Sequence, residues 1–319
     1  MQFPLFKPPV EWVVPDGYPD LSEAKEVAID LETKDPNLTT MGSGWPRKDG
    51  HIIGIAVAVE GDQWYFPIRH EIGSNLDPKM TMNWLRDVCS VNRNYIFHNA
   101  PYDVGWLLAE NVPISGRIID TMVIAPLLDE NRFSYALNAI GRDYLQERKS
   151  EKELREAADA FGVNAKSEMY KLPATYVGAY AEQDAALTLK LWNFFKSLIV
   201  KEDIQDIVEL ELKVLKTIIP MRQKGVRVDL DKAEIIQGDL LKREQQLIVE
   251  IKKQTGVEVE IWAADSVAKA FDALDLTYSK MAGYMQSSIH YAVMMVVQLQ
   301  ADSVIVTRTC NKYPLGTLK

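Results

Sequence analysis

Apolar positions in the first 120 residues fall into short runs that are separated by polar and turn residues. Runs of strand length occupy residues 27–31, 52–59, 64–68 and 95–97, and another lies near Ile118. Apolar runs of this length, bounded by polar residues, favour strands. The turn Glu60-Gly61-Asp62 joins the second run to the third and predicts a hairpin. The pattern therefore predicts a mixed sheet of five strands.

Helical periodicity replaces this pattern later in the chain. It covers residues 176–195, an apolar stripe between Glu211 and Ile219 that ends before Gly225, and the charge-rich residues 232–253. With the strands, these segments predict an α/β fold in which helices flank the sheet. We expect a first domain over residues 1–200, a small helical segment over 201–279 and an atypical tail over 280–319.

Two acidic residues lie at the end of the first predicted strand. Strand alternation places Asp30 and Glu32 on the same face, where two carboxylates repel each other unless a cation lies between them. Oxygen ligands select a hard ion such as magnesium or manganese. An acidic pair at a strand end is more often a solvated loop entrance, so this pair alone is weak support for a metal site.

A second polar cluster, Asn99-Ala-Pro-Tyr-Asp103, follows the strand over residues 95–97. Pro101 suits the first position of a helix, where its missing N–H is not needed. Asp103 then lies in the first helical turn. Such an aspartate can simply complement the helix dipole, and Asn99 can be only a cap or turn residue.

The third cluster lies on the helix predicted over residues 176–195. Tyr180 and Asp184 are spaced i, i+4, so a phenol and a carboxylate project from one face, one turn apart. A surface tyrosine near a surface aspartate is common. The three clusters support a common site only in combination, because each adjoins an element that could direct its acidic residues inward.

In combination, the clusters resemble the motifs of the 3′-5′ proofreading exonuclease of family A DNA polymerases, in the tyrosine subclass of the DEDD superfamily. The matching segments are Asp30-Leu-Glu-Thr33, His98-Asn-Ala-Pro-Tyr-Asp103 and Tyr180-Ala-Glu-Gln-Asp184, with a supporting match at Ile119-Asp-Thr-Met122. Residues 44–51 resemble an insertion of phage members. The resemblance implies a ribonuclease H-like fold.

The resemblance also implies roles for these residues. Asp30, Glu32 and Asp184 would hold one magnesium or manganese ion. Asp30 would hold a second ion together with Asp103, directly or through water, so that the two cations stabilise the attacking and departing oxygens. Tyr180, helped by Glu32, would orient the attacking water, and a 5′-mononucleotide would be released. Contacts to the terminal nucleotide would come from Thr33, Leu38, Asn99 and Tyr102.

The resemblance continues past the nuclease and then stops. Residues 209–229 resemble the segment that leads into the polymerase module, and residues 232–253 the start of a thumb. Residues 281–319 contain one acidic residue, Asp302, whereas the whole chain has 45. We therefore expect a chain truncated before the palm, which degrades DNA from the 3′ end and does not synthesise it. A natural truncation, a reading-frame change or an assembly artefact could each produce the tail.

A net charge of −9 is unusual for a protein that binds nucleic acid, since duplex affinity rests on basic patches. Cations bound to the carboxylates would reverse that charge locally. Cys89 and Cys310 provide no disulfide framework, and no membrane partner is expected. We expect a protein of the bacterial or phage-infected cytoplasm whose partners are a single-stranded 3′ end or primer-template DNA, with other replication proteins.

Two other functions remain open at this point. One is an exonuclease of the same superfamily that trims RNA 3′ ends, although the segment Lys224-Gly-Val-Arg-Val-Asp229 resembles polymerases. The other is a non-catalytic nucleic-acid-binding module, although all five residues of the active-site pattern are present. Metal-free nuclease chemistry has no support, because the sequence contains no evident Ser/His/Asp or Cys/His arrangement.

Overall fold

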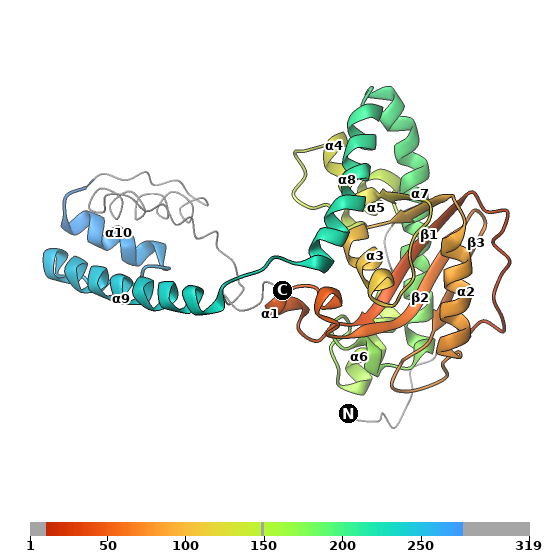
Figure 1. Cartoon of the computed structure of the whole chain (residues 1–319), viewed down its shortest axis with the longest axis horizontal. Coiled ribbons are helices and arrows are strands. Elements are labelled where there is room, and N and C mark those ends of the chain that lie inside the picture. Colours follow the sequence, from red (N-terminus) through yellow and green to blue (C-terminus); the bar gives the residue numbers. More distant parts are fainter. Residues whose placement is uncertain (1–10, 148–149, 277–319) are drawn as a thin grey trace. The chain divides into compact units, whose positions relative to one another are not determined.

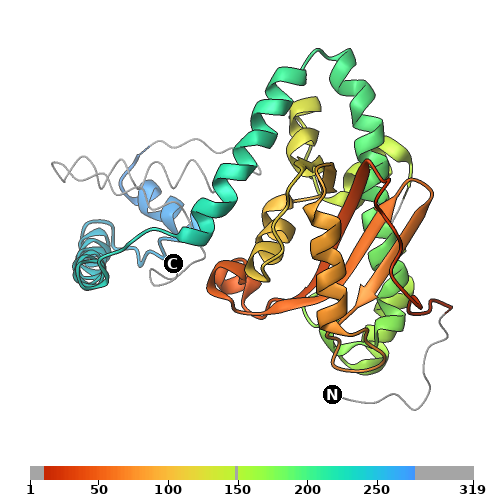
Figure 2. The same cartoon turned by 45° about the vertical axis from the view of Figure 1, so that its right-hand side comes forward.

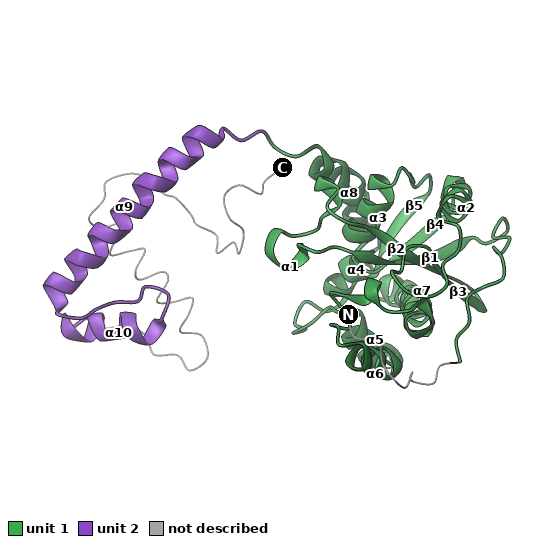
Figure 3. Ribbon diagram, turned by 90° about the horizontal axis from the view of Figure 1, so that it is seen from below, with its two compact units in different colours: residues 1–226, 319 green, residues 227–318 purple. Residues whose placement is uncertain are grey.

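A computed structural model describes residues 11–147 and 150–276, and the tail predicted over residues 280–319 lies outside this range. The chain divides into two compact units, with the boundary between Val226 and Arg227 (Figure 3). The first unit contains the sheet and every predicted site residue. Among the described residues of the second unit, regular structure is entirely helical.

One mixed sheet of five strands forms the centre of the first unit, in the order β3-β2-β1-β4-β5. β1 is antiparallel to β2 and parallel to β4, β2 is antiparallel to β3, and β4 is parallel to β5. This arrangement confirms the predicted hairpin and the ribonuclease H-like fold. The strands are Glu26–Lys34 (β1), His51–Val59 (β2), Asp62–Pro67 (β3), Asn94–Phe97 (β4) and Arg117–Asp120 (β5).

Helices cover both faces of the sheet (Figure 1, Figure 2). In the view of Figure 3, α2 (Pro78–Ser90) and α3 (Ala100–Ala109) lie on one side of the strands and α7 (Gly178–Lys201) on the other. β2 is buried from Ile52 to Ala58 because it is covered on both faces, which explains its continuous apolar sequence. The core therefore consists of the apolar strands and the faces of the helices that pack on them.

Of the helices of the first unit, the sequence predicted α3, α7 and α8 (Gln205–Lys224). Pro101 occupies the second position of α3, not the first, and the helix predicted from Tyr176 begins at Gly178. The α-helices are Leu38–Met41 (α1), Pro78–Ser90 (α2), Ala100–Ala109 (α3), Thr121–Leu128 (α4), Leu137–Leu145 (α5), Lys152–Phe161 (α6), Gly178–Lys201 (α7) and Gln205–Lys224 (α8). Short 3-10 helices are Trp45–Arg47 (η1), Met169–Lys171 (η2) and Ala174–Tyr176 (η3).

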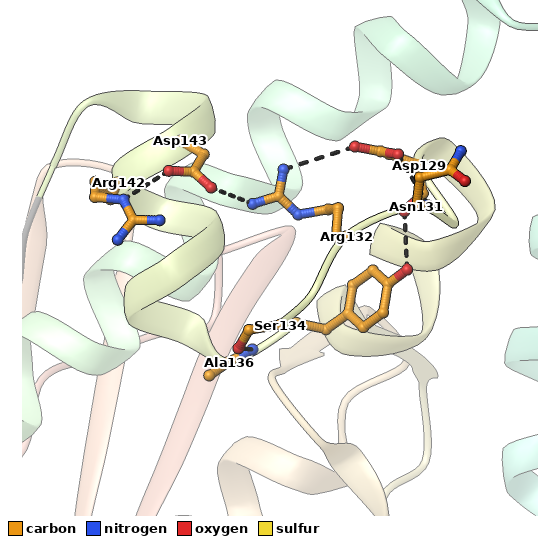
Figure 4. A network of polar contacts seen from close by, with 8 residues as sticks. Asp129, Asn131, Arg132, Ser134, Ala136, Arg142 and Asp143 are labelled. Carbon is orange, nitrogen blue, oxygen red and sulfur yellow. Dashed lines mark hydrogen bonds and ion pairs between the residues drawn. The ribbon is translucent and has the colours of Figure 1, made fainter. Parts of the chain in front are cut away.

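A polar network fixes the loop between α4 and α5 (Figure 4). The Arg132 guanidinium lies 2.5 Å from the Asp143 carboxylate and 3.8 Å from that of Asp129. Tyr135 donates its hydroxyl hydrogen to the Asp129 carbonyl at 2.9 Å. The network ties the loop to α5, which packs on α7. It therefore supports, from one side, the helix that carries Tyr180 and Asp184.

α8 packs on the first unit although the predicted first domain ends at residue 200. Val208, Leu212, Leu215 and Ile219 form its buried face, and an Arg117–Glu209 ion pair of 2.6 Å joins it to β5. The helix ends at Gly225, which has a φ of 71°, a conformation that suits glycine. The compact unit thus continues beyond α7, and the boundary at residue 200 stays a prediction.

The second unit contains α9 (Leu230–Thr255) and α10 (Ala264–Ala273). Asp229 caps α9 by accepting the Lys232 N–H at 3.1 Å, and Gly256 ends it. Val267 and Ala270 of α10 form a small buried cluster with Val259, which lies in the segment between the two helices. Across both units, none of the described helices is long and apolar enough to cross a bilayer.

Candidate active site

β1 carries the first acidic pair at the middle of the sheet. Asp30 lies opposite Ala56 of β2 and Glu32 opposite Gly54, and both acidic residues are half-buried. Alternation along the strand places both on one face, as predicted. Directly after Glu32 the register shifts, since Thr33 pairs with Ile52 and skips Ile53. Such a bulge redirects the side chains that follow it.

Asp103 reaches the same region from the first turn of α3. β4 pairs with β1 only as far as Ala28, so the later peptide groups of β1 have no strand on that side. The buried Asp103 carboxylate accepts the Leu31 N–H at 3.0 Å and satisfies one of these groups. The bond places Asp103 between Asp30 and Glu32 along the strand edge. Its position in the first turn was predicted, but this hydrogen bond was not.

Tyr180 and Asp184 approach from α7, one helical turn apart. Asp184 is buried and Tyr180 is half-buried. Burial raises the pKa of the Tyr180 hydroxyl far above its ordinary value, and the charge of Asp184 raises it further. Glu32 and Asp30 act in the same direction. The phenol therefore lies within electrostatic reach of three carboxylates that come from two elements.

The electrostatics of Asp103 show how closely the acidic groups gather. Burial, followed by the charge of Asp30, raises the pKa of Asp103 well above its ordinary value, although the Leu31 N–H opposes this. Asp103 and Asp30 therefore disfavour each other's charged form. Within residues 11–147 and 150–276, no set of three or more His, Cys, Asp or Glu side chains is already arranged to hold a metal ion. In type and charge, however, the carboxylate oxygens fit a hard divalent cation, which would relieve this repulsion.

Asp120, at the end of β5, holds the start of α3 through hydrogen bonds. Its fully buried carboxylate accepts the N–H groups of Asn99 and Ala100, at 2.9 and 2.8 Å, and that of Met122 at 2.9 Å. Asn99 has a φ of 75°, and its side chain makes no cap bond to the helix. The carboxylate of Asp120 thus takes the place of a cap from Asn99. The sequence offered Asp120 only as a supporting match, without this role.

The four residues expected to contact a nucleotide come from three segments. Thr33 and Tyr102 are joined through their hydroxyls at 2.6 Å, and Tyr102 donates to Asp35 at 3.2 Å. Asn99 is exposed at the start of α3. Leu38 lies at the start of α1 and is 42% exposed. The structure joins Thr33 to Tyr102 directly and leaves Leu38 and Asn99 accessible, while their roles stay predictions.

Tyr65 of the edge strand β3 is a further neighbour that the sequence did not indicate. Its fully buried ring extends over Gly54, where an added Cβ would lie 2.0 Å from the Tyr65 hydroxyl. Burial raises the pKa of Tyr65, and the charges of Glu32 and Asp30 raise it further. The hydroxyl also lies 2.6 Å from Nε2 of the buried His70. Gly54, directly opposite Glu32, therefore provides the space for a phenol beside the acidic pair.

His70 holds that phenol in place. Its Nδ1 lies 2.8 Å from the Leu172 carbonyl, so Nδ1 is the protonated nitrogen. Burial lowers the pKa of His70 to about 4. The ring is therefore neutral at pH 7, and Nε2 accepts the Tyr65 hydroxyl hydrogen. No motif in the sequence indicated this pair, because its members are ordinary residues of a strand and a loop.

Comparison with known proteins identifies the family. Residues 18–199 match the family described as 3′-5′ exonuclease (DNA_pol_A_exo1). A DNA-directed DNA polymerase of Pseudomonas phage M6 is 33% identical over 291 residues, which are 88% of this chain and 44% of that protein. The DNA polymerase DpoZ of Vibrio phage phiVC8 is 31% identical over 252 residues, 72% of this chain and 37% of that protein. This chain thus spans less than half the length of these relatives.

A solved structure supports the fold. The polymerase domain of Pol1 from M. smegmatis, in a complex with DNA primer-template and dNTP, aligns with a TM-score of 0.58 and 15% identity. The alignment covers 88% of this chain and 43% of that one. At this identity the likeness concerns the fold, whereas the family match includes all three acidic clusters. The chain belongs to the 3′-5′ exonuclease family of family A DNA polymerases, with phage DNA polymerases among its relatives.

Proposed function

We propose that this chain removes nucleotides from DNA 3′ ends as the proofreading part of a phage DNA polymerase. The observation that carries the proposal is that Asp103 of α3 and Tyr180 of α7 both lie within electrostatic range of Asp30 of β1, so that three elements meet at one acidic cluster. Their positions follow the acidic pattern of the family. Phage relatives also favour action in the cytoplasm of an infected cell.

The carboxylates would hold two magnesium or manganese ions. Asp30, Glu32 and Asp184 would bind one, and Asp30 with Asp103 the other. Bound there, two cations would supply charge that stabilises the attacking and leaving oxygens of an in-line displacement. Asp103 must be ionised to serve as a ligand, so the cation has to offset the burial and repulsion that raise its pKa.

Tyr180 would act on the attacking water as a hydrogen-bonding group. Its raised pKa keeps the hydroxyl protonated at neutral pH, so it orients the water and does not take its proton. Glu32 would accept a hydrogen bond from the same water. As the water attacks the terminal phosphorus, it would lose a proton to solvent, and the bond from phosphorus to the 3′ oxygen of the next nucleotide would break. That oxygen would take up a proton, and a 5′-mononucleotide would be released.

The terminal nucleotide would lie against the first turn of α3, the end of β1 and the start of α1. Thr33 and Tyr102 form one polar contact surface through their shared hydroxyl bond. Asn99 and the exposed Leu38 would complete it, with Leu38 against the base. Apolar and aromatic contacts tolerate every base, which suits an enzyme that must remove any mismatch. Polymerisation is not expected from this chain alone.

The decisive experiment is a cleavage assay with matched variants. A 5′-labelled single-stranded DNA and the corresponding RNA are incubated with wild type, Asp30→Ala and Asp184→Ala, with magnesium or with chelator. We expect stepwise shortening of the DNA by wild type with magnesium only. Both variants should lose this activity and remain folded, because removing a carboxylate relieves repulsion in the metal-free protein.

A control variant and the RNA arm complete the design. Asp87 is an exposed aspartate of α2, so Asp87→Ala should cleave at the wild-type rate. Near wild-type cleavage by Asp30→Ala or Asp184→Ala would refute the site. Faster shortening of RNA than of DNA would instead assign the same chemistry to RNA 3′ ends.

A further inference from the structure

Glu182 lies between Tyr180 and Asp184 in the sequence but serves a different side of α7. Successive helical residues are about 100° apart, so Glu182 projects almost opposite to both of them. Its side chain is half-buried. The chemistry assigned to the carboxylate cluster does not use it.

Two donors from separate segments converge on one oxygen of Glu182. Tyr65 donates its backbone N–H to Oε1 at 3.0 Å, and Trp12 donates its indole N–H to the same atom at 2.8 Å. β3 is an edge strand, so this Tyr65 N–H has no further strand to bond. The carboxylate thus connects α7 to the edge of the sheet.

Close packing around these hydrogen bonds restricts the Trp12 side chain and the start of α7. The Trp12 ring lies so close to Gly178, the first residue of α7, that an added Cβ would be 2.1 Å from it. Trp12 and Tyr65 also contact each other, with ring centroids 5.9 Å apart. Burial raises the pKa of Glu182, and the bonds from Trp12 and Tyr65 oppose this shift.

Tyr65 connects this contact to the acidic pair on β1. Its backbone bonds Glu182, and its side chain lies beside Glu32 and Asp30 and is held by His70. A single residue of β3 thus contacts α7 on one side and adjoins the β1 carboxylates on the other. The rotation of α7 about its axis sets how far Tyr180 and Asp184 lie from β1.

We propose that Glu182 is a positioning residue, which fixes the rotation of α7 against β3 and so places Tyr180 and Asp184 beside Asp30 and Glu32. Side chains end roughly 6 Å from a helix axis, so a rotation of about 10° moves them by about 1 Å. A displacement of about 1 Å at reacting groups can slow a reaction about 100-fold. The consequence for catalysis rests on the proposed exonuclease function.

The test compares Glu182→Ala with Glu182→Gln. Glutamine keeps an oxygen that accepts both N–H groups but carries no charge, whereas alanine removes the acceptor. We expect Glu182→Ala to lower kcat on single-stranded DNA about 10- to 100-fold with KM changed less than about 3-fold. Glu182→Gln should keep a kcat near that of wild type.

Amide hydrogen exchange over residues 178–185 gives a second readout that does not need activity. Exchange should be faster than wild type in Glu182→Ala and unchanged in Glu182→Gln. Wild-type kcat and exchange in Glu182→Ala would overturn the proposal, as would a Glu182→Gln variant as slow as Glu182→Ala, which would indicate a role for charge. If wild type itself lacks nuclease activity, the exonuclease function fails, and the exchange comparison alone decides the role of Glu182.

Trp12→Phe covers the case in which Glu182→Ala does not fold. It removes one donor and keeps an aromatic ring next to Gly178. We expect a smaller loss of kcat and faster exchange at the start of α7. Unchanged kcat and exchange in this variant would also overturn the proposal.

Discussion

At the scale of single residues, burial decides which groups are charged. Tyr180, Tyr65 and Asp103 lie in one acidic cluster, and burial is the largest cause of the raised pKa of each. Both phenols therefore remain hydrogen-bond donors at neutral pH. The clustered carboxylates repel one another, and the divalent cations proposed above would relieve that repulsion.

Tyr180→Phe tests the role of the hydroxyl. The substitution keeps the ring and its packing and removes only the group that would orient the water. We expect cleavage to slow by roughly 10- to 1,000-fold, which corresponds to about 1.4 to 4 kcal/mol of transition-state stabilisation. Single-turnover rates and DNA affinity are to be measured separately. Weak DNA binding with a normal rate at saturation would make Tyr180 a stacking residue.

His70 predicts a pH dependence of stability. Its pKa is about 4 in the folded protein against 6.5 ordinarily, so below pH 6.5 the unfolded chain takes up a proton before the folded one does. The lowered pKa contributes stability that is present above pH 6.5 and is lost as the pH falls towards 4, on the order of 3 kcal/mol.

Urea unfolding of wild type and His70→Gln between pH 7 and pH 4 measures this contribution. The variant should be less stable at pH 7, because the Tyr65 hydroxyl and the Leu172 carbonyl lose the imidazole to which they are hydrogen-bonded. It should also lose less stability on acidification. Parallel pH profiles of the two proteins would contradict the assignment of a neutral, buried His70.

At the scale of elements, the site depends on where strands stop pairing and helices begin. β1 continues beyond Ala28, where its pairing with β4 ends, and the Asp103 carboxylate accepts the Leu31 N–H on that side of β1. The register shift after Glu32 changes the direction of the chain that carries Thr33. Asp120 fixes the start of α3, and with it Asn99, Tyr102 and Asp103.

Asp120→Ala should therefore damage both stability and activity. It removes the acceptor of three N–H groups, of which that of Ala100 is buried and those of Asn99 and Met122 are partly buried. We expect this loss to cost on the order of 3 kcal/mol. Movement of the first turn of α3 should lower kcat as well. Thermal unfolding and the cleavage assay measure the two effects.

Asp77→Ala is the matched control, because Asp77 caps α2 through the Met80 N–H at 2.8 Å and is exposed. Losing that cap should cost about 1 kcal/mol and leave the cleavage rate unchanged. Equal effects of the two substitutions on cleavage would refute a specific role of Asp120 in placing α3.

At the scale of the whole molecule, the first unit contains the complete acidic cluster. The second unit contributes α9 and α10 among its described residues. The chain spans 44% of the Pseudomonas phage M6 polymerase and 37% of that of Vibrio phage phiVC8. Activities of those whole proteins therefore do not transfer to this chain without a test.

We expect no DNA synthesis from this chain. Polymerisation also needs carboxylates that hold cations, and residues 281–319 contain Asp302 as their single acidic side chain. Primer extension on a primed template with four deoxynucleotides measures DNA synthesis. The Asp30→Ala protein is used so that degradation does not mask synthesis. Any templated extension would show that a polymerase site exists.

The strands, the main helices and the residues of the acidic clusters could be predicted from the sequence. Short apolar runs and i, i+4 spacing are local properties, so Asp30, Glu32, Tyr180 and Asp184 could be assigned to faces of their elements. Asp103 was assigned to the site only from the family motifs, because an aspartate in the first turn of a helix is equally explained by interaction with the helix dipole. Their catalytic roles stay predictions that the variants above will test.

Which elements meet, and what holds them together, depends on contacts between residues that lie far apart in the sequence. The Glu182 contacts join residues 170 and 117 positions apart, and no local pattern encodes such a pairing. The same holds for Tyr65 over Gly54, and for Asp103 on the Leu31 N–H. These contacts depend on where strands end and on which backbone groups remain to be satisfied, and both are settled only when the sheet and helices pack together.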